Sequence, residues 1–341
     1  MPQRVTDNAA EIVRQACIAY GLPMRAHVSL TPVARGAMGQ IWCLDLGSQR
    51  YALKELLWGA DEASARYEAA VTARLAAAGI RLPGSLPTPD GRFLARLTGQ
   101  LGGRWLRLYQ WIDGAPVNPA TDHDMASRVG DLLGRLHAHA GTLPLPAGQP
   151  DSWYDTVPGP ATWAELASAA RGRDADWGPA LADRIGRLRE LAALVTGAPS
   201  DEMIICHRDL HPDNVLVDGS GELVLLDWDD VGPACPGREL AKLLADWHVH
   251  DGLPDTAAAA RTVAAYQAAG GTGRIRDERS FGMLIACMLN FLQAQAGVAL
   301  DPRAGPENRI YAAAEILDTL ARLPTPRLIS DLLAVAAAGV G

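Results

Sequence analysis

Residues 206–214 read CHRDLHPDN, and residues 227–229, thirteen positions after Asn214, begin a second motif that reads DWD. Asp209 and Asn214 therefore stand five residues apart, between apolar segments of strand-like composition. The second motif follows after about the length of one β-hairpin. Phosphoryl transfer needs this arrangement, because one carboxylate orients a hydroxyl nucleophile while an Asn/Asp pair holds magnesium on a nucleotide. The two motifs together predict a phosphoryl-transfer site.

Three residues are the first candidates for chemistry. Asp209 follows a predicted strand at 203–206, and the end of a rigid element can present a catalytic base or an orienting group. Asn214 and Asp227 offer oxygen atoms of the kind that magnesium binds. Asp227 ends the apolar run 223–226, an expensive place for a charge without a cation. We expect Asp209 to be catalytic and Asn214 and Asp227 to be metal ligands.

The remaining polar residues of the two motifs have less specific interpretations. His207 and Arg208 are interpreted as structural, since a histidine there can hydrogen-bond the loop backbone and hold its shape. His211 is interpreted as a loop-packing group rather than a base. Asp229 and Asp230 could help to hold the metal, face the substrate or be solvated, and the sequence leaves these alternatives open.

Lys54 is the candidate cation for the nucleotide phosphates. It lies in the strand-like run 50–57, where an inward lysine can neutralise α- and β-phosphates. Lysine is scarce, because Lys54 and Lys242 are the only two in the chain. Glu68, fourteen residues later in a predicted helix, is expected to pair with Lys54. Glu62 is the competing partner and is less favoured because it stands at the start of that helix.

A two-glycine turn precedes this lysine. Gly36 and Gly39 lie between two predicted strands, and a turn there could cover phosphates with backbone N–H groups. A plain hairpin turn is the alternative interpretation.

Hydrophobic periodicity and turn residues divide the chain into two parts. Residues 1–111 predict a helix, a five-stranded antiparallel sheet and one packed helix. Residues 112–341 predict a mainly helical part whose β segments are 203–206, 214–218 and 222–227, the last two joined in a hairpin by a turn at 218–221. The segment 113–116 is interpreted as a hinge, and the five prolines of 142–160 suggest a long loop or lid. In the first part we expect helices at 8–20 and 61–79 and strands at 26–33, 40–46, 50–57, 92–97 and 104–112. In the second part we expect helices at 122–140, 161–171, 178–196, 237–250, 255–269, 278–297, 306–322 and 326–338.

Charge is distributed unevenly between the two parts. Residues 1–111 contain 13 Lys/Arg and 8 Asp/Glu, a net charge of +5, whereas residues 112–341 contain 18 and 31, a net charge of −13. A basic small part suits a polyphosphate. An acidic larger part suits a cationic partner and disfavours nucleic acid, although ordinary solubilising charge is an equal alternative.

Composition and cysteine usage indicate a cytoplasmic protein. We identify no apolar stretch of the ~20 residues that span a bilayer, and the N-terminus lacks the apolar block of a signal peptide. The five cysteines are scattered, without a CxxC pair or histidines at zinc spacing, so free thiols are expected. Oligomeric state is not predicted.

Together these residues resemble the aminoglycoside phosphotransferase family, which shares the protein-kinase-like fold. The resemblance covers the lysine strand, the helix glutamate, the segment Trp111–Gly114, the 206–214 loop and the 227–229 motif. It implies an α+β, two-lobed fold, with residues 1–111 as the nucleotide-binding lobe and 112–341 as the helical lobe. It further implies Asp209 as catalytic base, Asn214 and Asp227 as Mg²⁺ ligands, Lys54 on the phosphates of ATP or GTP, and the backbone of Gln110 and Ile112 against the base.

The substrate implied is a small molecule with a hydroxyl group. Only about nine residues separate the 227–229 motif from the next predicted helix, which leaves no room for a peptide platform. An aminoglycoside or a basic peptide antibiotic is the favoured substrate, and metabolic kinases of the choline, homoserine or fructosamine type are the alternative. A catalytically silent nucleotide-binding protein is the alternative from another class. The acidic residues expected to receive ammonium groups are Asp229, Asp230, Glu239, Asp246 and Asp251.

Overall fold

The computed structural model describes residues 2–24, 28–35, 39–56, 60–119, 122, 124–146 and 151–338. The chain forms two compact units. Unit 1 comprises residues 1–117 and 213–230, and unit 2 comprises 118–212 and 231–341. The sequence-based boundary lay at 111/112, so the structure assigns 112–117 and 213–230 to the first unit instead.

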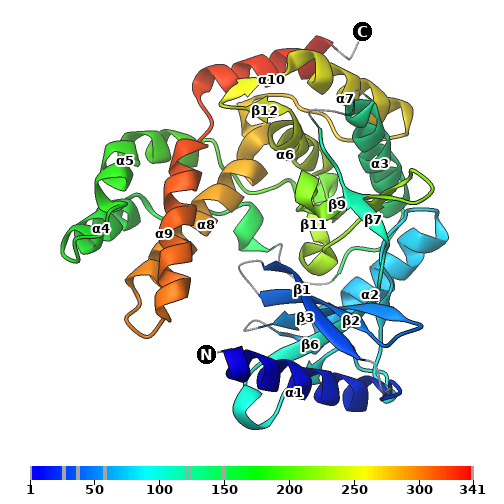
Figure 1. Cartoon of the computed structure of the whole chain (residues 1–341). Helices are drawn as coiled ribbons and strands as arrows, with labels where there is room; N and C mark the ends of the chain where they lie inside the picture. The colour runs from blue at the N-terminus through cyan, green and yellow to red at the C-terminus, as the bar shows by residue number, and fades with distance from the viewer. Residues whose placement is uncertain are drawn as a thin grey trace. The chain divides into compact units, whose positions relative to one another are not determined.

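Unit 1 is built on a six-stranded antiparallel sheet with the order β1-β2-β3-β6-β4, in which β5 also pairs with β6 (Figure 1). Five of these strands were predicted, and the two-residue β4 is additional. The strands are β1 (Ser29–Arg35), β2 (Gly39–Asp45), β3 (Arg50–Leu56), β4 (Ser85–Leu86), β5 (Ala95–Arg96) and β6 (Trp105–Gln110).

One face of this sheet is apolar because side chains alternate along each strand. Leu53 of β3 and Leu106 and Leu108 of β6 form a buried core with one side of α1 (Pro2–Tyr20). The hydroxyl of Tyr20 donates to the carbonyl of Leu106 at 2.7 Å and fixes the end of α1 to the sheet. The alternate residues of β3 and β6 consequently point to the opposite face.

Helix α2 (Glu62–Ala77) has clear local signals at both ends. The side chain of Asp61 caps its N-terminus by accepting from the backbone N–H of Ser64 at 2.8 Å. Gly79 follows with a φ of +88°, the left-handed conformation in which glycine commonly ends helices. The helix predicted at 61–79 is therefore confirmed, and it ends just before Gly79.

A second small sheet in unit 1 has the order β10-β9-β7. Strands β9 (Val215–Asp218) and β10 (Leu223–Leu225) form the predicted hairpin, in which Asp218 accepts hydrogen bonds from the backbone of Ser220 and Glu222. Strand β7 (Gly114–Pro116) pairs with β9. The segment interpreted as a hinge thus contributes a short edge strand.

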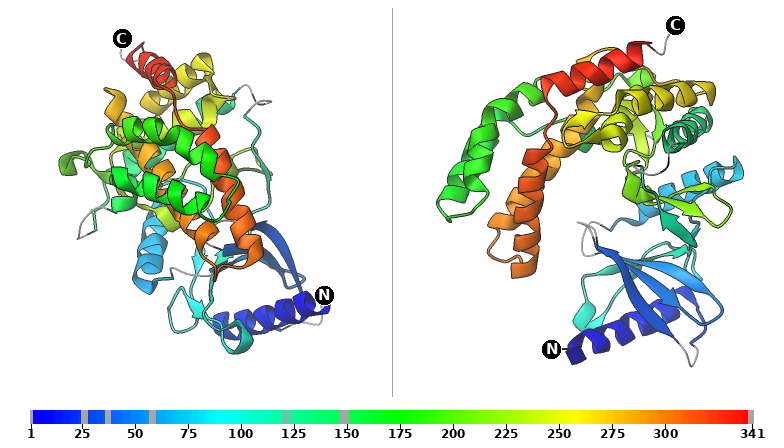
Figure 2. Two further views of the ribbon diagram at one scale, coloured as in Figure 1. Left: turned by 90° about the vertical axis from the view of Figure 1, so that its left-hand side faces the viewer. Right: turned by 45° about the horizontal axis from the view of Figure 1, so that its top comes forward.

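Unit 2 is mainly helical. Figure 2 shows the paired helices α4 and α5 and the paired helices α8 and α9 from two further directions. Its described helices are α3 (Met125–Ala140), α4 (Pro160–Arg171), α5 (Gly178–Ala192), α6 (Pro236–His248), α7 (Thr256–Ala268), α8 (Gly282–Leu300), α9 (Pro306–Ala321) and α10 (Pro326–Ala338). Two short antiparallel pairs accompany them, β8 (Ile204–Cys206) with β11 (Gly232–Ala234), and β12 (Val249–His250) with β13 (Leu253–Pro254). Across both units, single 3₁₀ turns lie at η1 (Gly99–Leu101), η2 (Ser152–Tyr154), η3 (Ser200–Glu202), η4 (Pro212–Asn214), η5 (Trp228–Asp230) and η6 (Glu278–Phe281).

Helices α3 and α7 approach closely because α3 carries glycines at the contact. A Cβ atom on Gly130 would lie 2.3 Å from the carbonyl oxygen of Thr262, and one on Gly134 would lie 2.4 Å from that of Tyr266. We expect Gly130→Ala to lower the free energy of unfolding by about 1–3 kcal/mol through overpacking. Urea denaturation followed by circular dichroism measures this loss.

The matched control is Gly186→Ala in α5, where a Cβ atom would meet nothing within 4 Å. Alanine is the better helix former by about 1 kcal/mol, so this variant should be as stable as the parent or more stable. Equal destabilisation by both substitutions would contradict the packing argument.

The expectation that no segment is long and apolar enough to span a membrane was wrong for one helix. Residues Glu278–Leu300, which include α8, pass that test by length and composition. Met283, Ile285, Leu289 and Leu292 of this helix are buried in unit 2. A core helix has the same composition, so the feature is weak evidence for a membrane segment.

The proline-rich segment 142–160 is described except for residues 147–150. It contains η2, and Asn290 of α8 donates hydrogen bonds to the carbonyls of Trp153 and Thr156, both at 2.8 Å. These bonds fasten 153–156 to α8 within unit 2. A role for the segment as a lid stays a prediction.

Candidate active site

The two predicted metal ligands lie on neighbouring segments of unit 1. In the β9–β10 hairpin Val215 pairs with Leu225, and the next backbone bond joins the N–H of Leu226 to the carbonyl of Asn214 at 2.8 Å. Asp227 is the following residue. The hairpin register therefore brings Asn214 and Asp227 to the same end of this small sheet, as the spacing of the motifs predicts.

Asp227 has an unusual backbone conformation. Its φ is +56°, in the left-handed region that a residue with a side chain rarely adopts. Such strain persists where the surroundings impose it, and it is concentrated at functional sites. The side chain is about two fifths exposed, so one carboxylate is presented to solvent at the end of a buried strand.

Lys54 binds the carboxylates of the 227–229 motif. Its Nζ lies 2.6 Å from Oδ1 of Asp227 and 2.6 Å from Oδ2 of Asp229, and the residue is 8% exposed. Burial alone would lower the pKa of Lys54, but Asp229 and Asp227 outweigh it and raise this pKa above its usual range. The side chain of Lys54 therefore stays protonated, as a residue that is expected to bind phosphate must be.

Glu68 has a different partner from the one predicted. It accepts from Nη1 of Arg107 at 2.5 Å, and the same nitrogen lies 2.8 Å from Oδ1 of Asp229. The hydroxyl of Tyr109 is also within reach of Glu68, at 3.2 Å. The expectation that Glu68 pairs with Lys54 is corrected accordingly. Arg107 was not among the predicted site residues, because its position opposite Lys54 follows only from the register of β3 and β6.

Glu62, the competing partner for Lys54, has another role. Its carboxylate accepts from the backbone N–H groups of Phe93 and Leu94 at 3.0–3.3 Å. It fastens the segment before β5 to the start of α2.

The residues predicted to contact the nucleotide from the glycine turn and from 110–112 lie only partly within the described residues. Gly36 lies outside the described residues. Gly39 is required by packing, since a Cβ atom there would lie 1.9 Å from the carbonyl oxygen of Glu55. The backbone N–H of Gln110 donates to the carbonyl of Gly84 at 2.9 Å. The carbonyl of Gln110 and the N–H of Ile112 stay the predicted contacts for the nucleotide base.

Gln110 and Ile112 line a cavity of about 560 Å³ in unit 1. Its other walls include Tyr20, Tyr51 and Leu108, which belong to the α1 side of the sheet. Lys54 lies on the opposite side by strand alternation. This cavity is therefore distinct from the space next to Lys54.

Asp209 lies in unit 2, after β8. Its carboxylate is 3.2 Å from Nζ of Lys242 and 3.4 Å from Nε2 of His211, and Lys242 is also 2.8 Å from Asp246. Burial alone would raise the pKa of Asp209, but His211 and Lys242 hold it well below its usual range. Such a carboxylate is a permanent anion. It is suited to accepting a hydrogen bond from a hydroxyl and orienting it.

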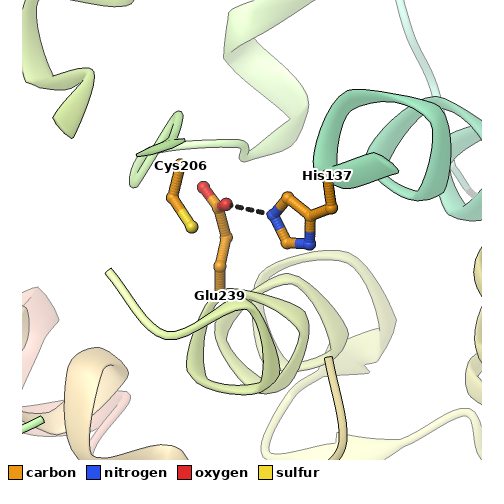
Figure 3. A group of neighbouring side chains, drawn as sticks. All are labelled: His137, Cys206 and Glu239. Carbon is orange, nitrogen blue, oxygen red and sulfur yellow. Dashed lines mark hydrogen bonds and ion pairs between the residues drawn. The ribbon is translucent and has the colours of Figure 1, made fainter. Parts of the chain in front are cut away.

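A buried cluster supports the loop that carries Asp209. Figure 3 shows Glu239 of α6 between His137 of α3 and Cys206 of β8. Glu239 accepts from the backbone N–H of Arg208, and its other oxygen lies 2.6 Å from Nε2 of His137. His207, next to Arg208, accepts the backbone N–H of Asp209 at 3.2 Å through Nδ1, as the structural interpretation of this histidine predicts.

The geometry of this cluster permits a metal, but its chemistry argues against one. One potential ligand atom from each of its three side chains lies within 4.8 Å of the others. Burial raises the pKa of the Cys206 thiol well above its usual range, and the thiol lies 3.4 Å from the carbonyl of Ala234 as a donor. Metals bind the thiolate. A hydrogen-bonded support is the better interpretation.

The five acidic residues expected to bind substrate have different surroundings. Glu239 is 1% exposed and occupied by the cluster above, which argues against contact with substrate. Asp229 and Asp246 are paired with Lys54 and Lys242. Asp230 and Asp251 are exposed, and Asp251 lies in the turn between β12 and β13.

Residues 29–280 match the phosphotransferase enzyme family, which is more than half of the chain. The chain belongs to this family. A homoserine kinase of Pseudomonas aeruginosa is 32% identical over 258 residues, which are 72% of this chain and 73% of the relative. The predicted family and enzyme class are thereby confirmed: the protein is a small-molecule phosphotransferase with a hydroxyl group as acceptor.

Two solved structures share the fold. A spectinomycin phosphotransferase in complex with ADP and spectinomycin has a TM-score of 0.59 at 15% identity, covering 97% of this chain and 98% of that chain. A microcompartment-associated aminopropanol kinase has a TM-score of 0.60 at 18% identity, covering 96% and 99%. The predicted α+β, kinase-like fold class is confirmed.

Proposed function

We propose that this protein transfers the γ-phosphate of ATP or GTP to the hydroxyl group of a small hydroxy amino acid or amino alcohol, with homoserine as the first candidate. The similarity to homoserine kinase over most of the chain carries this proposal. It favours the metabolic alternative over the antibiotic substrate that the resemblance first suggested.

The charges around Asp209 support a small acceptor with few positive charges. Asp209 and Asp246 contribute two negative charges, and Lys242 contributes one positive charge within hydrogen-bonding reach. Burial alone would lower the pKa of His211, but Asp209, 3.4 Å away, outweighs it and raises this pKa, which favours the charged ring. The cluster is then close to neutral. A polycationic antibiotic needs an excess of unpaired carboxylates, since each ammonium group must be compensated as it loses water.

Two of the other predicted acidic residues add little to such a surface. The carboxylate of Glu239 is enclosed, and that of Asp229 is shared between Lys54 and Arg107. An amino acid or amino alcohol carries one ammonium group, so it does not require the full set of five carboxylates.

In the proposed reaction Asp209 accepts the hydrogen bond of the acceptor hydroxyl and directs its oxygen at the γ-phosphorus. Lys54 binds the nucleotide phosphates, and the backbone of Gln110 and Ile112 binds the base. Asn214 and Asp227 fit Mg²⁺, because both offer oxygen donors at one end of the β9–β10 hairpin. When bound there, Mg²⁺ would neutralise charge that develops on the phosphates.

A turnover screen tests this proposal. Purified protein with ATP or GTP is offered L-homoserine, choline, ethanolamine, aminopropanol, spectinomycin and an aminoglycoside, with mass spectrometry to detect the added phosphate. We expect kcat/KM for L-homoserine to exceed that for the antibiotics by at least about 10²-fold. Faster turnover of an antibiotic would overturn the proposal, and nucleotide binding without turnover of any acceptor would favour the silent binding protein.

A further inference from the structure

Two cations face each other in unit 1 at the predicted phosphate site. Lys54 of β3 and Arg107 of β6 are directly opposite in the antiparallel register. Residues paired in this way have Cβ atoms about 5 Å apart on one face of a sheet. Both are at least nine tenths buried. Two like charges in this position repel each other, so the arrangement depends on the anions that surround them.

The surrounding carboxylates are divided between the two cations. Nη1 of Arg107 binds Glu68 at 2.5 Å and Asp229 at 2.8 Å. Nζ of Lys54 binds Asp227 and Asp229, both at 2.6 Å. Asp229 therefore bridges the two cations, whereas Glu68 of α2 binds Arg107.

Burying the side chain of Arg107 costs folding free energy. Its Nε and Nη2 atoms are buried without a hydrogen-bond partner, and a buried donor that lost its water without replacement is destabilising. An apolar residue at this place in β6 would avoid that cost. The contribution of this guanidinium is therefore sought in the two carboxylates that its Nη1 binds.

We propose that Arg107 is the positioning residue that anchors the α2 glutamate, Glu68, and the bridging Asp229, and that it thereby leaves the ammonium of Lys54 available to the nucleotide phosphates. Nη1 of Arg107 binds Glu68 and Asp229 together, so Asp227 and one oxygen of Asp229 are the carboxylate partners left to Lys54. Without Arg107, Glu68 would be a buried anion with Lys54 as the nearest cation. Lys54 would then be drawn from the phosphates toward α2.

The inference rests on the nucleotide site of the proposed function but not on the identity of the acceptor. Its test is therefore a binding measurement. The dissociation constant of a fluorescent ADP analogue with Mg²⁺ is measured by titration for Arg107→Met, Glu68→Gln, Lys54→Met and the doubles R107M/E68Q and K54M/E68Q. Thermal unfolding of each variant shows that it is folded.

We expect R107M to weaken nucleotide binding at least tenfold. Adding E68Q to R107M should restore part of that loss, because the unpaired anion is removed, whereas E68Q and K54M should combine additively. Arg107→Lys should recover part of the affinity, since it keeps one charge near Glu68. With an acceptor available, R107M should raise KM for the nucleotide and leave KM for the acceptor unchanged.

The matched control is Arg104→Met. Arg104 stands just before β6 and pairs with Glu55 at 2.7 Å, and within the described part of the chain it forms no ion pair with Glu68 or Asp229. Its loss should change nucleotide affinity less than twofold. Unchanged affinity in R107M, or coupling between Lys54 and Glu68 instead, would overturn this inference alone. A parent protein that binds no nucleotide would overturn the proposed function as well.

Discussion

Replacing Asp209 with asparagine is expected to lower kcat by about 10³-fold, within the range that a positioned acid–base group contributes. Asparagine has nearly the same shape but lacks the negative charge that orients a hydroxyl. The substitution also leaves Lys242 and His211 without the carboxylate that they contact at 3.2 and 3.4 Å. Initial-rate measurements with the best acceptor, together with thermal unfolding, separate the loss of chemistry from any loss of stability.

Asp213→Asn is the control for this prediction. Asp213 is an exposed acidic residue only four positions further along, so its substitution tests a change of charge in the same stretch. It should leave kcat within a few-fold of the parent value. If the D209N variant retained more than a tenth of the parent kcat, the role assigned to Asp209 would be untenable.

The carboxylate of Asp209 also predicts how the activity depends on pH. His211 and Lys242 hold the pKa of Asp209 well below its usual range, so it is ionised throughout any pH at which the protein is assayed. A depressed pKa means that protonation, and with it loss of function, begins only in strong acid. An acidic limb of kcat/KM between pH 5 and 7 must then come from another group, and Asp209 would act by orientation more than by taking up a free proton.

The parts of the site that depend on local sequence could be predicted. Asn214 and Asp227 are joined by one short hairpin, so the spacing of two motifs fixes their meeting in unit 1. The helix stop at Gly79 likewise depends on one residue in a left-handed conformation. In each case the determining contacts lie within about a dozen residues along the chain.

The parts that depend on long-range register could not be predicted. Glu68 was assigned to Lys54 by its distance along the chain, but its partner Arg107 becomes visible only when β3 and β6 are aligned. Glu239 was assigned to substrate because it is acidic. Its enclosure depends on His137, 102 positions away, and on the backbone of the Asp209 loop. A charge in a sequence does not reveal whether the fold will neutralise it.

Replacing Asp227 with asparagine is the second substitution with a large expected effect. Asparagine tolerates the left-handed conformation that Asp227 adopts, with a φ of +56°, so the strand end should keep its shape. The variant loses the charge that attracts Mg²⁺ and one of the two carboxylates on Lys54. We expect kcat to fall at least about 10²-fold, as for the loss of a group that stabilises charge in the transition state.

The dependence on Mg²⁺ distinguishes a metal ligand from a partner of Lys54. If Asp227 binds the metal, D227N should need a much higher Mg²⁺ concentration for half-maximal activity, while nucleotide binding without Mg²⁺ changes little. If Asp227 only positions Lys54, the Mg²⁺ requirement should stay the same and binding without metal should change. Asp174→Asn is the matched control, because Asp174 is an exposed aspartate with a φ of +50°. It should leave the rate, the Mg²⁺ requirement and the melting temperature unchanged, since it shares the backbone conformation of Asp227 but none of its ionic partners among the described residues.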